Sequence, residues 1–392
     1  MKIYSRVLAL SLVAALVSCH KDIPFEEPTL KLDPSKHYIH FEADITTRGA
    51  LVEGDVLMDD FNVLGYMYSG NWNAEKVFAK PNVFDATPEK VKYNSADGLF
   101  SYGTAPKVWT GNRYSFFAYY PTEHPKAADK VDFANTITLF DNGTVKQNDP
   151  YIIYTLPISD DPRDLIDVMT ASYIDTGVAS SASVALKFRH RLSAIDVGAR
   201  NYYEYDHDND STTPVKQVTI EIVNLEVNLT NINSTSAKIY LDHTIPTELN
   251  YISPKASKSY KMVDKDAEWA VSTFDVIPNT SSDRAIRLVT TPSGENASSL
   301  MLLPQEDLLK GMLKLIYKKK YQDDGGNWVY LHEGDNVNDF EFNPDLPINF
   351  SKQLIEGRRY FIELTFTSDA VSVNIIAADE WDTLPDVKHE FE

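Results

Sequence analysis

The sequence predicts an all-β fold. Short runs in which apolar and polar residues alternate recur along the chain, as expected for strands with one face in a core. Clusters of Gly, Asn and Asp separate these runs and supply turn residues. The chain has 22 tyrosines against 16 glycines, and flat amphipathic rings suit the half-buried face of a sheet.

Seven segments carry the clearest strand pattern: 61–68, 114–120, 184–188, 218–227, 313–317, 328–331 and 360–366. The segment 114–120 is apolar on both sides, since Phe116 and Phe117 point in opposite directions from one strand. A strand of this kind must be covered on both faces. We therefore expect Phe117 to be buried, as well as Phe116.

Turn chemistry predicts one hairpin clearly, where Asp323-Asp324-Gly325-Gly326 separates 315–317 from 328–330. The lysines Lys318-Lys319-Lys320 follow the first of these runs, and we interpret them as a charged strand end that discourages edge pairing. Two segments, 162–170 and 304–313, are the best candidates for short helices.

A length of 392 residues predicts two domains, each large enough to bury its own core. A weak internal repeat supports this number, because 109–116 and 355–362 share a glycine, an arginine before a tyrosine, and an alternating strand. We place the boundary near Ala182, which gives an N-terminal domain of 38–182 and a C-terminal domain of 183–392.

The first 18 residues have the pattern of an export signal. Lys2 and Arg6 precede an apolar run that is too short to span a bilayer. The run ends in Leu16-Val17-Ser18-Cys19, which resembles the bacterial lipobox, in which the cysteine is lipidated and becomes the new N-terminus. Cys19 is the only cysteine, so no disulfide can form within the chain. Residues 19–37 are polar and proline-containing, as in an extended tether.

The composition disfavours several functions. A net charge of −20 would repel nucleic acid or an anionic membrane surface. The chain lacks G-x-S-x-G, H-E-x-x-H and P-loop motifs, and one cysteine cannot build a paired-cysteine zinc site. We therefore expect no enzyme activity, no metal and no cofactor. His190 is interpreted as structural, and Trp72 as packing on its own sheet rather than stacking on a sugar or a host protein.

Four segments, in the same order, resemble motifs of the Bacteroidetes fimbrillins, the subunits of type V pili. Residues 109–121, WTGNRYSFFAYYP, resemble the G-x-x-Y-x-F-x-A-Y-Y-P strand of that family. The other three are 186–195, 301–305 and 356–366, which resemble F-x-H-x-L-A/S, L-x-P-Q and G-x-x-Y-x-I-x-L. The resemblance implies two transthyretin-like β-sandwich domains in tandem, export as a lipoprotein, no cofactor, and assembly into pili by strand exchange.

In the polymerising fimbrillins an arginine-specific protease removes the N-terminal strand, and a strand from a neighbouring subunit fills the groove. Arg48-Gly49 stands where that cleavage site would lie, although a plain connection remains the alternative. The run before it places Ile39, Phe41 and Ala43 on one face. We expect 38–45 to pair along a sheet edge.

The C-terminal segment is the candidate donor strand, with Leu384, Val387 and Phe391 as its apolar residues. The run 371–376 also alternates. It is either part of the donor or the closing strand of the second sandwich.

Two functions follow from these patterns. The first is a structural and adhesive subunit of a cell-surface pilus (fimbria), whose partners are other subunits, the outer membrane through a lipid anchor, and an adhesion ligand on a host or bacterium. The alternative is a monomeric, surface-anchored lipoprotein that binds a glycan or a host protein.

Overall fold

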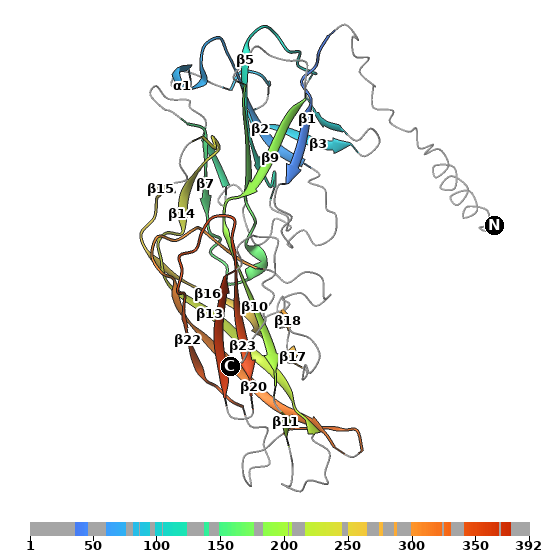
Figure 1. Ribbon diagram of the computed structural model, residues 1–392, viewed down its shortest axis with the longest axis vertical. Helices are drawn as coiled ribbons and strands as arrows, with labels where there is room; N and C mark the ends of the chain where they lie inside the picture. Colours follow the sequence, from blue (N-terminus) through green and yellow to red (C-terminus); the bar gives the residue numbers. More distant parts are fainter. Residues whose placement is uncertain are drawn as a thin grey trace, which may run out of the picture. The chain divides into compact units, whose positions relative to one another are not determined.

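The computed structural model describes residues 36–45, 60–75, 81–85, 87–94, 99–103, 105–123, 137–140, 149–175, 183–202, 204–205, 216–244, 250–264, 274–276, 286–287, 299–323, 325–330, 341–367 and 370–377. The chain divides into two compact units, Met1–His37 and Tyr38–Glu392, and the strands of the described residues belong to the second. Nearly all described elements are strands (Figure 1), which confirms the all-β fold class. Ala182 lies outside the described residues, so the boundary placed there stays a prediction.

Seven strands form a closed ring. Around the ring they are β1 (Phe41–Ile45), β4 (Leu99–Tyr102), β3 (Glu89–Asn94), β2 (Asp60–Tyr68), β5 (Arg113–Tyr120), β8 (Met169–Ile174) and β9 (Val184–His190). Their inward side chains form the first core, in which Phe41 of β1 meets Phe61 of β2 and Phe116 of β5. Opposite walls thus pack face to face, as in a sandwich. The ring differs from the expected sandwich in that β1 joins both edges, with five residue pairs to β9 and one to β4.

β5 is covered on both faces, as the sequence predicts. Phe116 and Ala118 belong to the ring core, whereas Phe117 and Tyr119 belong to a second, larger core. Phe117 is fully buried, and the ring of Trp72 in α1 (Trp72–Glu75) lies 5.1 Å from its ring centroid. The interpretation of Trp72 as a residue that packs on its own sheet is therefore confirmed.

A four-stranded sheet supplies part of the second core. Its order is β15 (Asn250–Tyr251), β14 (Ser236–Tyr240), β7 (Tyr151–Thr155) and β6 (Ile137–Phe140). Ile152 of β7 and Ile239 of β14 are fully buried in the same cluster as Phe117. The outer face of β5 and this sheet therefore share one core.

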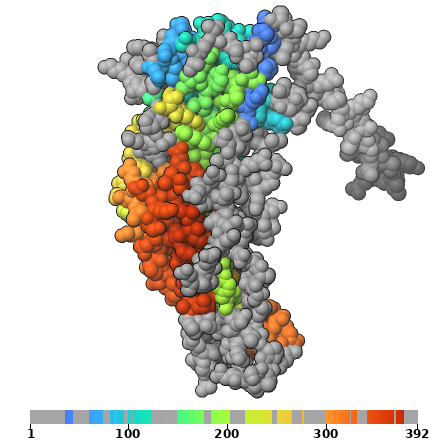
Figure 2. All heavy atoms as spheres, viewed as in Figure 1, coloured from blue at the N-terminus to red at the C-terminus, as the bar shows by residue number. Residues whose placement is uncertain are grey.

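Two further sheets complete the second core. The first has the order β18 (Ile286–Arg287), β10 (Ser193–Asn201), β23 (Arg359–Phe366) and β24 (Val371–Ala377), with β19 (Leu300–Leu302) also on β10. The second has the order β16 (Ala256–Asp264), β13 (Thr219–Ile232), β20 (Lys310–Gln322) and β21 (Trp328–Tyr330), with β17 (Phe274–Val276) on β13 and β22 (Asp345–Asn349) on β20. β11 (Glu204–Tyr205) and β12 (Lys216–Gln217) form a separate pair. Residues of β22, β23 and β24, orange to red, lie together on the face seen in Figure 2.

All seven expected strands are present, as β2, β5, β9, β13, β20, β21 and β23. The expected hairpin is also confirmed, since β20 pairs with β21 through Lys320↔Tyr330 and Gln322↔Trp328.

Both helix predictions are wrong. Only a 3-10 turn, Pro162–Asp164, forms in 162–170, and 304–313 leads into β20 at Lys310. Ile166 and Val168 are buried two residues apart, as are Leu313 and Leu315, a spacing that suits extended chain. No helix within the described ranges has the length and hydropathy needed to cross a bilayer.

Candidate functional site

The first strand closes the ring. β1 runs parallel to β9 through five residue pairs, from Phe41↔Val184 to Ile45↔Phe188, and antiparallel to β4 at Phe41↔Phe100. Just before the strand, the Val184 amide donates to the His40 carbonyl at 2.7 Å. β1 therefore lies between two neighbours rather than at a sheet edge, which corrects the sequence expectation.

Phe41 is the main anchor of β1. Its side chain is 1% exposed, and its ring packs against four other aromatic rings at centroid distances of 5.3–6.2 Å. Those rings belong to Phe61, Phe84, Tyr102 and Phe116. Three of the four are edge-on contacts, the geometry that aromatic pairs favour.

The residues before and after Phe41 continue the same face. Ile39 is 1% exposed, and Ala43 is half-buried against the ring core. This confirms the predicted apolar face of 39–43. The Ile39 amide also donates to the Lys107 carbonyl at 2.9 Å, and the Tyr102 hydroxyl donates to the Ile39 carbonyl at 3.2 Å.

The groove that holds β1, called the seat of β1 below, is lined by β4, β9 and the aromatic rings around Phe41. A loop that the sequence did not single out, residues 82–84, completes it. The Asn82 and Val83 amides both donate to the Gly65 carbonyl of β2, at 2.9 and 3.2 Å. The Asn82 side chain accepts from the Met67 amide at 2.7 Å and donates to the Met67 carbonyl at 3.1 Å. The loop thus pairs with β2 beyond the last residue pair of β2 with β3, which is Val63↔Glu89. Phe84 can then reach Phe41 because Gly65 has no side chain, since a Cβ there would lie 2.7 Å from the Phe84 ring.

The seat of β1 is the candidate functional site, because it is a slot for one strand. A short strand fills the slot by pairing its backbone with β9 and by placing every second side chain in the core. Neither requirement depends on which chain the strand belongs to. Without β1, the facing edge of β9 would have unpaired N–H and C=O groups, and the seat of Phe41 would meet water.

The sequence-predicted site residues lie outside the described residues. This holds for Cys19, for Arg48 and Gly49, and for Leu384, Val387 and Phe391. The segment 371–376 is described, and it forms β24, which pairs with β23 through seven residues. It is therefore the closing strand of its sheet.

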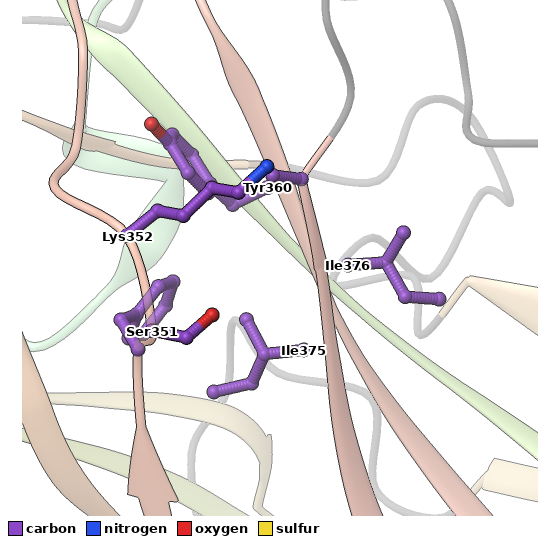
Figure 3. Close-up of a pocket in the computed structure, with 7 residues that line it drawn as sticks. Ser351, Lys352, Tyr360, Ile375 and Ile376 are labelled. Atoms are coloured by element: carbon purple, nitrogen blue, oxygen red, sulfur yellow. The ribbon is translucent and has the colours of Figure 1, made fainter.

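β24 lies at the end of its sheet, and no other described strand pairs with it. Beside it is a cavity of about 240 Å³, into which Ile375 points from β24 and which Ser351 and Lys352 face from the opposite side (Figure 3). Phe350, Tyr360, Ile376 and Ala377 complete its lining. The cavity lining has no His, Cys, Asp or Glu, and within the described ranges no group of three or more such residues could hold a metal ion.

Two of the sequence motifs, 186–195 and 356–366, meet where the chain leaves β9 and where it enters β23. The Gly357 amide donates to the Leu192 carbonyl at 2.9 Å, and Gly357 has a φ of 69°, which favours glycine. Glu356 lies between two arginines, with its Oε1 3.3 Å from Nε of Arg191 and 3.7 Å from Nε of Arg189. Burial raises the pKa of Glu356 and lowers the pKa of Arg191 to about 10.

His190 lies at the same junction. Its side chain is 2% exposed, and Nδ1 is 2.6 Å from Oδ2 of Asp167. An imidazole held in this way positions the chain at the end of β9 and cannot meet a substrate from solvent. This placement agrees with its interpretation as structural.

Comparisons with known proteins agree with this fold. A search of curated proteins found no match. A fimbrial protein from Bacteroides vulgatus superposes with a TM-score of 0.56 at 19% identity, covering 87% of this chain and 99% of the other. A candidate cell adhesion protein from Bacteroides uniformis has a TM-score of 0.40 at 13% identity, with 88% and 99% covered. The family model described as fimbrillin-like matches residues 59–379, so this chain belongs to the fimbrillin-like family.

Proposed function

We propose that this chain is a non-enzymatic structural and adhesive subunit of a cell-surface pilus, and that it assembles by protease-triggered strand exchange. Membership of the fimbrillin-like family supports the pilus role. The seat of β1 supports the mechanism, since a single short strand closes an otherwise continuous ring. In the precursor β1 acts as a plug, and in the pilus a strand from the next subunit takes its place.

The exchange has a physical driving force. Once β1 leaves, β9 has unpaired backbone groups, and the seats of Ile39 and Phe41 are open. Covering each such side chain stabilises by about 1.5–3 kcal/mol, and each satisfied buried backbone group adds to that. A donor strand restores the backbone pairing and covers the apolar groove again, which is β-augmentation. The open subunit therefore binds its neighbour rather than staying free.

Cleavage after Arg48 would release β1, which ends only three residues earlier at Ile45. The chain from Gly49 onward would keep the rest of the ring. The donor in this proposal is the C-terminal segment with Leu384, Val387 and Phe391, because β24 is already paired within its own sheet.

The export signal and Cys19 place the protein at the outer membrane and cell surface in this proposal, through an acyl anchor. The acyl group anchors the precursor, because cleavage after Arg48 would remove Cys19 together with β1. Cys19→Ala, combined with Arg48→Ala, should therefore release the uncleaved protein from the outer membrane. Retention equal to that of Arg48→Ala alone would contradict the anchor without bearing on the strand exchange.

Two variants test the exchange. Arg48→Ala should block an arginine-specific cut and keep the protein monomeric, whereas deletion of 384–392 should allow the cut but remove the donor. The measurements are N-terminal sequencing of surface material and its size on a denaturing gel without boiling. Wild-type protein should begin at Gly49 and form a resistant ladder. Normal polymers from both variants would contradict protease-triggered strand exchange and favour the alternative, a monomeric surface-anchored lipoprotein that binds a glycan or a host protein.

A further inference from the structure

Lys320 lies between two carboxylates on the face of its sheet that points away from the second core. Its Nζ is 2.7 Å from Oδ1 and 2.8 Å from Oδ2 of Asp275, and 2.9 Å from Oε2 of Glu221. The residue is 9% exposed, although its lysine cluster was interpreted as a charged strand end that discourages edge pairing. Instead β20 pairs with β13 on one side and with β21 and β22 on the other.

The three side chains come from three neighbouring strands. Glu221 of β13 is opposite Asp275 of β17, and β20 lies on the other side of β13. Strands are about 4.8 Å apart, so the Lys320 side chain must cross β13 to reach Asp275. It passes Glu221 on the way. The arrangement therefore joins β17, β13 and β20 through one amine.

Trp328 lies beside this amine, and Tyr330 lies beside Glu221. The Tyr330 hydroxyl donates to Oε2 of Glu221 at 3.0 Å, and because β21 and β13 flank β20, the Tyr330 ring must lie across β20. The Trp328 ring lies on the same side, with its centroid 5.5 Å from the Lys320 Nζ. The group is open to water on the Asp275 side, where that side chain is 48% exposed, and Trp328 is 51% exposed.

We propose that Lys320 and Asp275 become joined by an intramolecular amide bond, with Glu221 as the group that transfers protons. Nζ lies close to both Asp275 oxygens, which places it beside the carboxyl carbon, and rotation about the Cβ–Cγ bond turns the face of the carboxyl toward it. Glu221 accepts from the amine at Oε2, and the Tyr330 hydroxyl donates to the same oxygen and holds it in place.

The reaction balances as a condensation. The Nζ–Cγ bond forms, and one C–O bond of Asp275 breaks. Both protons of the released water come from the Lys320 ammonium through Glu221, which ends in its starting state. No oxidant, reductant or cofactor is needed, and the exposed side of Asp275 gives the water an exit.

Fixed geometry favours this condensation over its intermolecular equivalent. Well-oriented groups in one molecule react as if each were present at roughly 10⁵–10⁸ M. Burial by itself lowers the pKa of Lys320, but the hydrogen bonds to Asp275 and Glu221 raise it above the usual lysine value. Proton transfer to Glu221 must therefore come first, so the bond should form slowly after folding.

The chain offers a matched comparison in Lys90, which also lies between two carboxylates. Its Nζ is 2.9 Å from Oδ2 of Asp60 and 2.7 Å from Oε1 of Glu123, and the other Asp60 oxygen accepts from the Thr122 hydroxyl. The Lys90 side chain is 33% exposed, against 11% for Lys320. We expect Lys90 to remain an ordinary ion pair.

Mass spectrometry of the full chain tests the bond. Wild-type protein should weigh one water less than the Glu221→Gln variant after correction for the substitution, since any N-terminal processing is the same in both. A tryptic digest of the wild type should contain a branched peptide that joins Lys320 to Asp275, whereas Glu221→Gln should give two separate peptides. Lys320→Arg keeps a cation at the site, should lack the branch and should melt at a lower temperature.

Several results would overturn the proposal. Unlinked peptides from aged wild-type protein would reject the bond itself. A branch of equal yield in Glu221→Gln would reject Glu221 as the proton-transfer group, and a branch at Lys90 would reject the dependence on two carboxylate oxygens and burial. The test is independent of pilus assembly, because it is read on the single chain.

Discussion

Phe41→Ala tests whether one ring holds β1 in its seat. Phe41 is 1% exposed and touches four aromatic rings. Replacing a buried phenylalanine with alanine costs about 3–5 kcal/mol. If this loss falls on the opening of β1 alone, the open state should become roughly 10²- to 4 × 10³-fold more populated, since each 1.4 kcal/mol is a factor of ten.

Hydrogen exchange measures this opening residue by residue. The Val184 amide, which donates to His40 at 2.7 Å, should exchange faster by that factor, while amides of β13 and β20 should keep their protection. Phe350→Ala is the control, because Phe350 is 3% exposed and lies 5.9 Å from the Tyr360 ring, away from β1. If Phe41→Ala accelerates all amides equally, β1 does not open on its own, and it is not a removable plug.

Three other substitutions test the packing and the charges. Gly311→Ala should destabilise by about 1–3 kcal/mol in denaturant unfolding, because the new Cβ would overlap the Asn228 carbonyl oxygen, whereas Gly111→Ala meets nothing and should be neutral. Trp72→Phe should lower stability by about 1–3 kcal/mol, because it leaves buried Asp242 without the indole N–H that donates to it at 2.9 Å; an unchanged unfolding midpoint would reject that bond. Burial, then Arg189 and Arg191, lower the pKa of His243 to about 3. The unfolded chain therefore binds this proton from about pH 6.5 downward while the folded chain does not, so stability should fall between pH 6.5 and 3 by at most about 1.4 kcal/mol per pH unit. His243→Gln should flatten that slope, and an unchanged slope would contradict the assignment.

The strands could be predicted because their pattern is local. In β5, alternation alone gave the two faces, and the opposite burial of Phe116 and Phe117 follows from the pleat. The hairpin of β20 and β21 was predicted for the same reason, since its turn residues lie between its strands.

Long-range pairing could not be predicted in this way. Nothing near Phe41 indicates that it pairs with Val184, or that the pairing is parallel. Asn82 and Phe84 belong to a short loop whose contacts depend on the absence of a side chain at Gly65. An aromatic residue in a polar loop was the one available signal.

The lysine cluster shows why charge patterns mislead in sheets. Lys318-Lys319-Lys320 were interpreted as a charged strand end that discourages edge pairing, yet Lys320 binds carboxylates of β13 and β17, which lie far away in the sequence. A cation in a strand is exposed or buried according to what the neighbouring strands carry, and that depends on register.

The seat of β1 also limits which tail residues can replace it. Residues that share the face of Phe41 must be an even number of positions apart, so Val387 and Phe391 can enter together, and Leu384 then points away. If Phe391 takes the seat of Phe41, His389 falls at buried Ile39 when the tail runs in the direction of β1, but at half-buried Ala43 when it runs in reverse. An imidazole is costly in the buried position, so we expect a reversed donor, antiparallel to β9. Phe391→Ala should then weaken binding of a 378–392 peptide to cleaved protein by about 3–5 kcal/mol, whereas Leu384→Ala should change it little. Equal losses from both substitutions would mean that the tail does not enter this slot as a strand.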